Sequence, residues 1–99
     1  MVHAFVQDVP IDDATYARIT AALGDEPMPG CLVHLCVRNP AGGLRYIDVW
    51  ESEEACARAF DERIHPAVDT AFAGRRPPEP HLERLDVIEL TGRVTAPPA

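Results

Sequence analysis

Four segments of the chain are rich in β-branched, aromatic and other apolar residues, a composition typical of strands. Proline, glycine and asparagine residues gather between these segments and predict turns. The short turn at residues 39–43 joins two of the segments and therefore predicts a β-hairpin. The four strands are expected at residues 2–9, 31–38, 44–50 and 81–90.

Two of the segments between the strands carry apolar residues at helical spacing. Asp12 and Ser52 are suited to cap the N-termini of these helices, because their side-chain oxygens can accept hydrogen bonds from free backbone N–H groups. Gly24 is expected to end the first helix. Pro66 is expected to interrupt the second helical region and to push His65 away from helical dihedral angles.

The element order strand–helix–strand–strand–helix–strand predicts one domain over residues 1–90, followed by a C-terminal tail at 91–99. With right-handed crossovers, this order gives a four-stranded antiparallel sheet with two helices on one face. The sequence therefore predicts an α+β protein of the ferredoxin-like type. Two helices cover only one face of such a sheet, so the other face needs water or a partner.

The hairpin register decides which side chains share a face of the sheet. The opposed pairs are expected to be Arg38–Leu44, Cys36–Tyr46, His34–Asp48 and Leu32–Trp50. The other face is then wholly aliphatic and contains Val33, Leu35, Val37, Ile47 and Val49. A shift by one residue would scatter polar groups over both faces, so this register is the consistent one. An aliphatic face on an acidic protein favours self-association.

Charge and composition exclude several classes of function. Sixteen acidic and nine basic residues give a net charge of −7, which disfavours binding to nucleic acid or to anionic membrane surfaces. All nine basic residues are arginines, and without lysine neither Schiff-base chemistry nor a P-loop is available. No apolar run is long enough to cross a membrane and no signal peptide is visible, so a cytoplasmic location is expected.

The three cysteines do not have the spacing of metal ligands. Cys31 and Cys36 lie in one predicted strand, where five residues place them roughly 16 Å apart and on opposite faces. That separation is too large for a disulfide, so these residues and Cys56 are expected to be small buried hydrophobes. No metal, flavin or nucleotide is expected. Haem is the one exception considered, with His34 or His65 as its axial ligand.

The element order over residues 2–90 and the string DVWESEEA at 48–55 resemble the small antibiotic-biosynthesis-monooxygenase-like proteins of the dimeric α+β barrel superfamily. The resemblance implies a homodimer whose sheets pack into a barrel, with a pocket in each subunit and chemistry that often needs no metal or flavin. Haem-degrading relatives use an asparagine, a tryptophan and a histidine. Only Trp50 matches, because Phe5 and Ala59 stand at the other two positions, so haem degradation is not expected.

His34 lies in an otherwise apolar strand and is the strongest candidate for chemistry. It could accept a proton from a phenolic or enolic substrate while Asp48 fixes its tautomer, or it could be a structural histidine bonded to Asp48. Tyr46 and Trp50 are expected to form a pocket wall that binds substrate, with His65 at the rim; the alternative is that they are ordinary core residues.

Two functions stay open on the sequence alone. One is a monooxygenase-like enzyme of the antibiotic biosynthesis type, an oxidoreductase that oxygenates an aromatic polyketide-like substrate without a cofactor. The other is a non-catalytic homodimer that binds a small aromatic or apolar ligand or serves a structural role. The resemblance implies a homodimer in both cases. A pocket lined by apolar and a few polar groups would separate a binding protein from a purely structural one.

Overall fold

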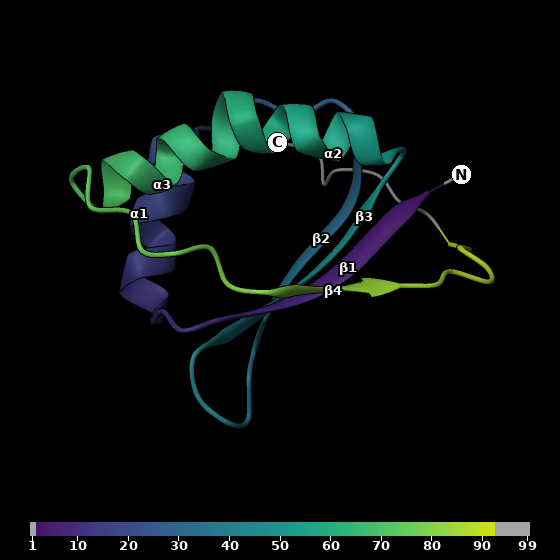
Figure 1. Cartoon of the computed structure of the whole chain (residues 1–99), viewed down its shortest axis with the longest axis horizontal. Helices are drawn as coiled ribbons and strands as arrows, with labels where there is room; N and C mark the ends of the chain where they lie inside the picture. The colour runs from purple at the N-terminus through teal and green to yellow at the C-terminus, as the bar shows by residue number, and fades with distance from the viewer. Residues whose placement is uncertain (1, 93–99) are drawn as a thin grey trace.

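The computed structural model describes residues 2–92 and shows a single antiparallel sheet with the helices on one of its faces (Figure 1). The sheet order is β2-β3-β1-β4. The strands are β1 (His3–Val9), β2 (Cys31–Arg38), β3 (Leu44–Trp50) and β4 (Leu82–Leu85). The helices are α1 (Asp13–Leu23), α2 (Glu53–Ala59) and α3 (His65–Ala71). This architecture confirms the predicted ferredoxin-like fold.

The predicted helix caps are both present. The Asp12 carboxylate accepts a hydrogen bond from the backbone N–H of Thr15 at 2.8 Å, and the Ser52 hydroxyl accepts one from Ala55 at 3.0 Å. Gly24, with a φ of 86°, ends α1. Local sequence therefore fixes where each helical region begins.

The predicted break at Pro66 is wrong. His65 has helical dihedral angles, with φ −60° and ψ −43°, and α2 runs into α3 through a π-helical turn at Phe60–Ile64. A proline ring inside an α-helix collides with the carbonyl group four residues earlier, which here belongs to Glu62. Since Glu62 lies in the wider π turn, the helix accommodates the proline ring and continues past it.

The hairpin pairs His34 with Asp48, Cys36 with Tyr46 and Arg38 with Leu44, as predicted. A β-bulge between Cys31 and Val33 then changes the register, so Cys31 rather than Leu32 lies opposite Trp50. The bulge inserts one extra residue and reverses the alternation of faces. Cys31 and Cys36 therefore lie on the same face of the sheet, and the prediction of opposite faces is wrong.

β4 is much shorter than the predicted strand at 81–90. It pairs with β1 from Gln7↔Leu82 to Ala4↔Leu85, and β1 itself begins at His3. Residues 86–92 thus pass the end of the partner strand and join no ladder. From residue 93 onward the predicted tail lies outside the described residues.

Phe5 and Trp50 are the fully buried centre of the core between the sheet and α2. Cys56 and Ala59 of α2 pack against them. On the opposite face of the sheet, no helix among the described residues covers the aliphatic side chains, and Leu35 and Val37 are 49% and 38% exposed. Within residues 2–92, no helix is long and apolar enough to span a membrane.

Candidate functional site

A cavity of about 460 Å³ lies between the inner face of the sheet and the helices. Its lining is mostly apolar, as expected of a site for an organic ligand. The main apolar side chains are Ile19, Leu23, Met28, Phe60, Ile64, Val68 and Phe72. The polar side chains include Gln7, Tyr16, His34, Tyr46, Asp48 and His65.

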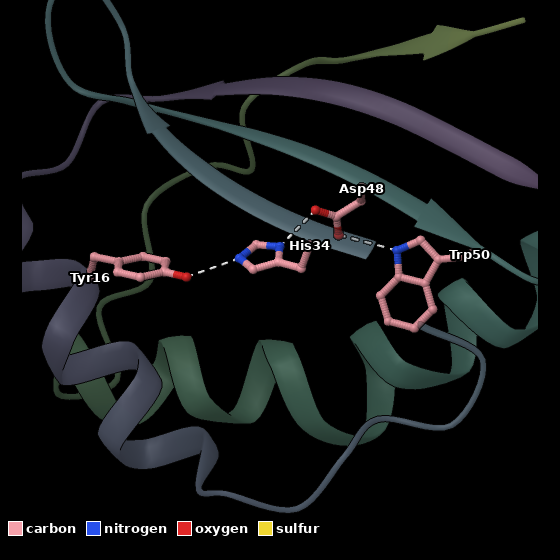
Figure 2. A network of polar contacts seen from close by, with 4 residues as sticks. All are labelled: Tyr16, His34, Asp48 and Trp50. Carbon is pink, nitrogen blue, oxygen red and sulfur yellow. Dashed lines mark hydrogen bonds and ion pairs between the residues drawn. The ribbon is translucent and has the colours of Figure 1, made fainter. Parts of the chain in front are cut away.

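Four of the inner-face and helix residues form a continuous chain of hydrogen bonds (Figure 2). One carboxylate oxygen of Asp48 lies 2.7 Å from Nδ1 of His34, and the other accepts a hydrogen bond from Nε1 of Trp50 at 3.1 Å. The hydroxyl group of Tyr16, on α1, lies 2.9 Å from Nε2 of His34. These hydrogen bonds thus link the buried carboxylate of Asp48, through His34, to the phenol of Tyr16 at the cavity wall.

The hydrogen-bond partners determine the tautomer of His34. Asp48 is 4% exposed, and its carboxylate only accepts, so the proton of the neutral imidazole belongs on Nδ1. Nε2 is then an acceptor, and the Tyr16 hydroxyl donates to it. Trp50 supplies a second donor to Asp48, which holds the carboxylate in place behind the histidine.

The two tyrosines at the cavity wall stay protonated at neutral pH. Burial raises the pKa of Tyr16 to about 12, and the nearby Cys36 and Asp48 add to the rise. Burial likewise raises the pKa of Tyr46 well above its ordinary value. The Tyr46 ring lies 5.3 Å from the His34 ring and 5.7 Å from the Tyr16 ring, centroid to centroid. Three polar aromatic groups therefore meet at one side of the cavity.

His65 lines the same cavity from α3. Its Nε2 lies 3.3 Å from a carboxylate oxygen of Glu79, and its ring meets the Phe60 ring edge-on at 5.6 Å. Glu79 belongs to the proline-rich segment before β4, which Gln7 ties to β1 by donating to the carbonyl oxygen of Pro80 at 2.8 Å. This segment thereby closes one side of the cavity.

The structure brings together most of the predicted site. His34, Asp48, Tyr46 and His65 all line one cavity. Trp50 does not, and the prediction that it forms part of the pocket wall needs correction: it is fully buried in the core, and its contact with the site is the hydrogen bond to Asp48.

Sequence reasoning missed Tyr16 as a site residue. In the sequence, Tyr16 is one member of the apolar stripe of the first helix, and nothing local distinguishes it from a core aromatic. Only the packing of α1 over the sheet brings its hydroxyl to His34. Gln7 did carry a signal, because it is an uncharged polar residue that shares one face of the first predicted strand with Phe5.

No group of three or more metal-ligating side chains gathers within residues 2–92. The two histidines considered as haem ligands are both engaged: His34 through both ring nitrogens, and His65 through Nε2. Either histidine would have to give up such a contact to bind iron through that nitrogen.

The chain matches no protein-family model and no curated protein. It does resemble the crystal structure of a Chloroflexus aurantiacus J-10-fl protein that is described, provisionally, as an antibiotic biosynthesis monooxygenase. The TM-score is 0.61 and the sequence identity 21%, over 93% of this chain and 98% of that chain. The likeness confirms, at the level of the fold, the resemblance seen in the sequence.

Proposed function

We propose that this protein binds a small aromatic molecule with an acidic hydroxyl group and oxygenates it as a monooxygenase-like enzyme without metal or flavin. The observation that carries the proposal is the His34–Asp48 pair at the wall of a mostly apolar cavity. The description of the Chloroflexus protein supports the reaction type. A cytoplasmic location fits this role and is part of the proposal.

The proposed reaction needs only the substrate, dioxygen and a base. His34 accepts the proton of a phenol or enol, and Asp48 stabilises the imidazolium that forms. The substrate anion gives up electrons to dioxygen; one oxygen atom forms a new bond to carbon, and the other leaves as water when the carbonyl of the product forms. The substrate is the reductant. The apolar cavity keeps bulk water away from the reacting anion.

Anthrone, an enolisable three-ring ketone, is a suitable probe for this chemistry. We expect the protein to consume dioxygen and convert anthrone to anthraquinone and water, faster than the solution without protein. His34→Ala should slow this turnover by about 100-fold or more, within the range for a lost general base. His81→Ala is the matched control, because His81 is exposed and does not line the cavity. Full activity of His34→Ala would contradict the assignment of the base.

The alternative function, a non-catalytic ligand-binding or structural homodimer, also has an observation in its favour. Nε2 of His34 already has a partner in Tyr16, and no fully buried side-chain nitrogen or oxygen within the described residues lacks a hydrogen bond. A network satisfied in this way is typical of structural polar groups. Binding of anthrone without uptake of dioxygen would favour this function.

We also propose that a second copy of this chain covers the aliphatic face of the sheet. The face carries Val33, Leu35, Val37, Ile47 and Val49, and no helix of residues 2–92 covers it. At about 25 cal/mol per Å² of apolar area, burial of a few hundred square ångströms contributes several kcal/mol to association. The resemblance to the dimeric α+β barrel proteins supports a homodimer.

A further inference from the structure

The side of His34 that faces the cavity is already occupied. Nε2 of a neutral imidazole has one lone pair, and the Tyr16 hydroxyl donates to it at 2.9 Å. A ligand hydroxyl cannot donate to the same lone pair while Tyr16 stays in place. The Tyr16 oxygen keeps its own lone pairs, however, and Tyr16 lines the cavity.

From this geometry we infer that Tyr16 is a further catalytic residue: it meets the acidic hydroxyl of the ligand and passes the proton on to His34. The inference rests on the proposed function and adds the identity of the group that touches the ligand. Asp48 and Trp50 then act as positioning residues behind the histidine, with Asp48 bonded to His34 and Trp50 bonded to Asp48.

The proton moves in one concerted step. The O–H bond of the ligand breaks and its proton forms a new bond to the Tyr16 oxygen. The original Tyr16 proton moves to Nε2 of His34. The ligand becomes an anion, Tyr16 stays a neutral phenol, and His34 becomes an imidazolium ion beside the Asp48 carboxylate. This step transfers protons only, so nothing is oxidised or reduced.

Two further observations favour a relay over simple displacement of Tyr16. The Tyr16 ring has two ring neighbours, Tyr46 at 5.7 Å and His34 at 6.3 Å, centroid to centroid, and these contacts hold the side chain in place. Burial, the first cause of the high pKa of Tyr16, also makes a free tyrosinate costly there. The proton must therefore leave for His34 as the new one arrives.

The resting state of the relay can be tested without a ligand. Nitrogen-15 NMR of the imidazole ring distinguishes the two neutral tautomers. We expect His34 to carry its proton on Nδ1, and Tyr16→Phe to shift the resonance of Nε2, which loses its donor. The opposite tautomer, or an Nε2 resonance unmoved by Tyr16→Phe, would overturn the inference.

The transfer itself can be tested with alizarin, a hydroxyanthraquinone whose anion absorbs at longer wavelength than its neutral form. At a pH where free alizarin is mostly neutral, we expect wild-type protein to bind the anion. Tyr16→Phe should lower the ratio of ionised to neutral alizarin in the bound state by about tenfold or more, because a hydrogen bond to the charged oxygen is lost. Thr15→Val, which removes a hydroxyl from the same helix outside the cavity, should bind the anion like wild type.

The outcomes separate the inference from the proposed function. Bound alizarin that is equally ionised in wild type and Tyr16→Phe would show that His34 takes the proton directly. This result would overturn the relay and leave the proposed function standing. Wild-type protein that neither binds alizarin nor oxidises anthrone would contradict the proposed function, and the relay with it.

Discussion

Asp48 is the residue on which the geometry of the site depends most. Its side chain is buried, and it accepts hydrogen bonds from His34 on one oxygen and Trp50 on the other. A buried carboxylate without such donors would be strongly unfavourable. The two hydrogen bonds offset the cost of burying the Asp48 carboxylate, and they also fix the orientation of the His34 ring.

Replacement of Asp48 by asparagine tests this dual role. An amide keeps the shape but has one acceptor oxygen where the carboxylate has two, so one donor loses its partner. We expect Asp48→Asn to lower the free energy of unfolding by about 1–3 kcal/mol, measured in urea. The control is Asp13→Asn, which alters an exposed pair with Arg38 and should change stability little. Equal stability of Asp48→Asn and wild type would contradict the role assigned to Asp48.

The thiol groups provide a test of burial that depends on pH. Burial raises the pKa of Cys56 to about 12 and that of Cys31 to about 11. Only the thiolate reacts with iodoacetamide, so a raised pKa slows the reaction at neutral pH, and the rate should rise as the pH approaches the raised value. We expect Cys56 to resist alkylation at pH 8 in the folded protein and to react quickly in guanidinium chloride. Rapid modification of Cys56 without denaturant would show that the core is open.

The individual residues of the site were predictable to different degrees. The His34–Asp48 pair follows from the hairpin register, which local alternation of side chains fixes. The role of Tyr16 depends on how α1 lies over the sheet, a tertiary relation that no local pattern contains. Trp50 was predicted on the correct face, but its depth beneath α2 depends on the same packing.

At the scale of elements, the contact between the segment before β2 and α2 is unusually close. Gly30 has a φ of 86°, and a Cβ atom built there would lie 2.6 Å from the Cβ of Ala55 in α2. The carbonyl oxygen of Gly30 also accepts a hydrogen bond from the backbone N–H of Glu51 at 2.8 Å. A side chain at position 30 would therefore push α2 away from the sheet.

Two glycines with the same φ allow this contact to be measured. Gly24 also has a φ of 86°, but a Cβ there would meet nothing within 4 Å. We expect both Gly24→Ala and Gly30→Ala to lower the free energy of unfolding through backbone strain. Gly30→Ala should lower it by about 1–3 kcal/mol more, because its Cβ collides with Ala55. Urea denaturation of the two variants gives the difference. Equal losses would mean that α2 and this segment are not in close contact.

The elements that could be predicted are those with local signals. The helix starts at Asp12 and Ser52, and the hairpin strands, follow from caps, turns and alternation. The π turn at Phe60–Ile64 and the bulge after Cys31 could not be predicted, because each is an adjustment of a regular element to its packing. β4 ended early for a similar reason: its length is set by where β1 begins.

At the scale of the whole molecule, one face of the sheet forms the site with the helices, and the other face is covered by no helix of the part of the chain that the structure describes. We expect light scattering at micromolar concentration to give the mass of a dimer. Leu35→Asp, on the uncovered face, should shift the mass to that of a monomer, because a carboxylate would be buried in the interface. Ile88→Asp is the matched control, since Ile88 is 92% exposed and lies outside the sheet. A monomer mass for wild-type protein would contradict the dimer.

The central claim is that the cavity binds an acidic aromatic hydroxyl group beside the hydrogen-bonded residues Tyr16, His34 and Asp48. A crystal structure of the protein with alizarin tests this claim most directly. We expect alizarin to lie within the cavity between the sheet and the helices, with one hydroxyl oxygen within hydrogen-bonding distance of the Tyr16 oxygen. Alizarin bound elsewhere, or a cavity without alizarin at saturating concentration, would contradict the claim.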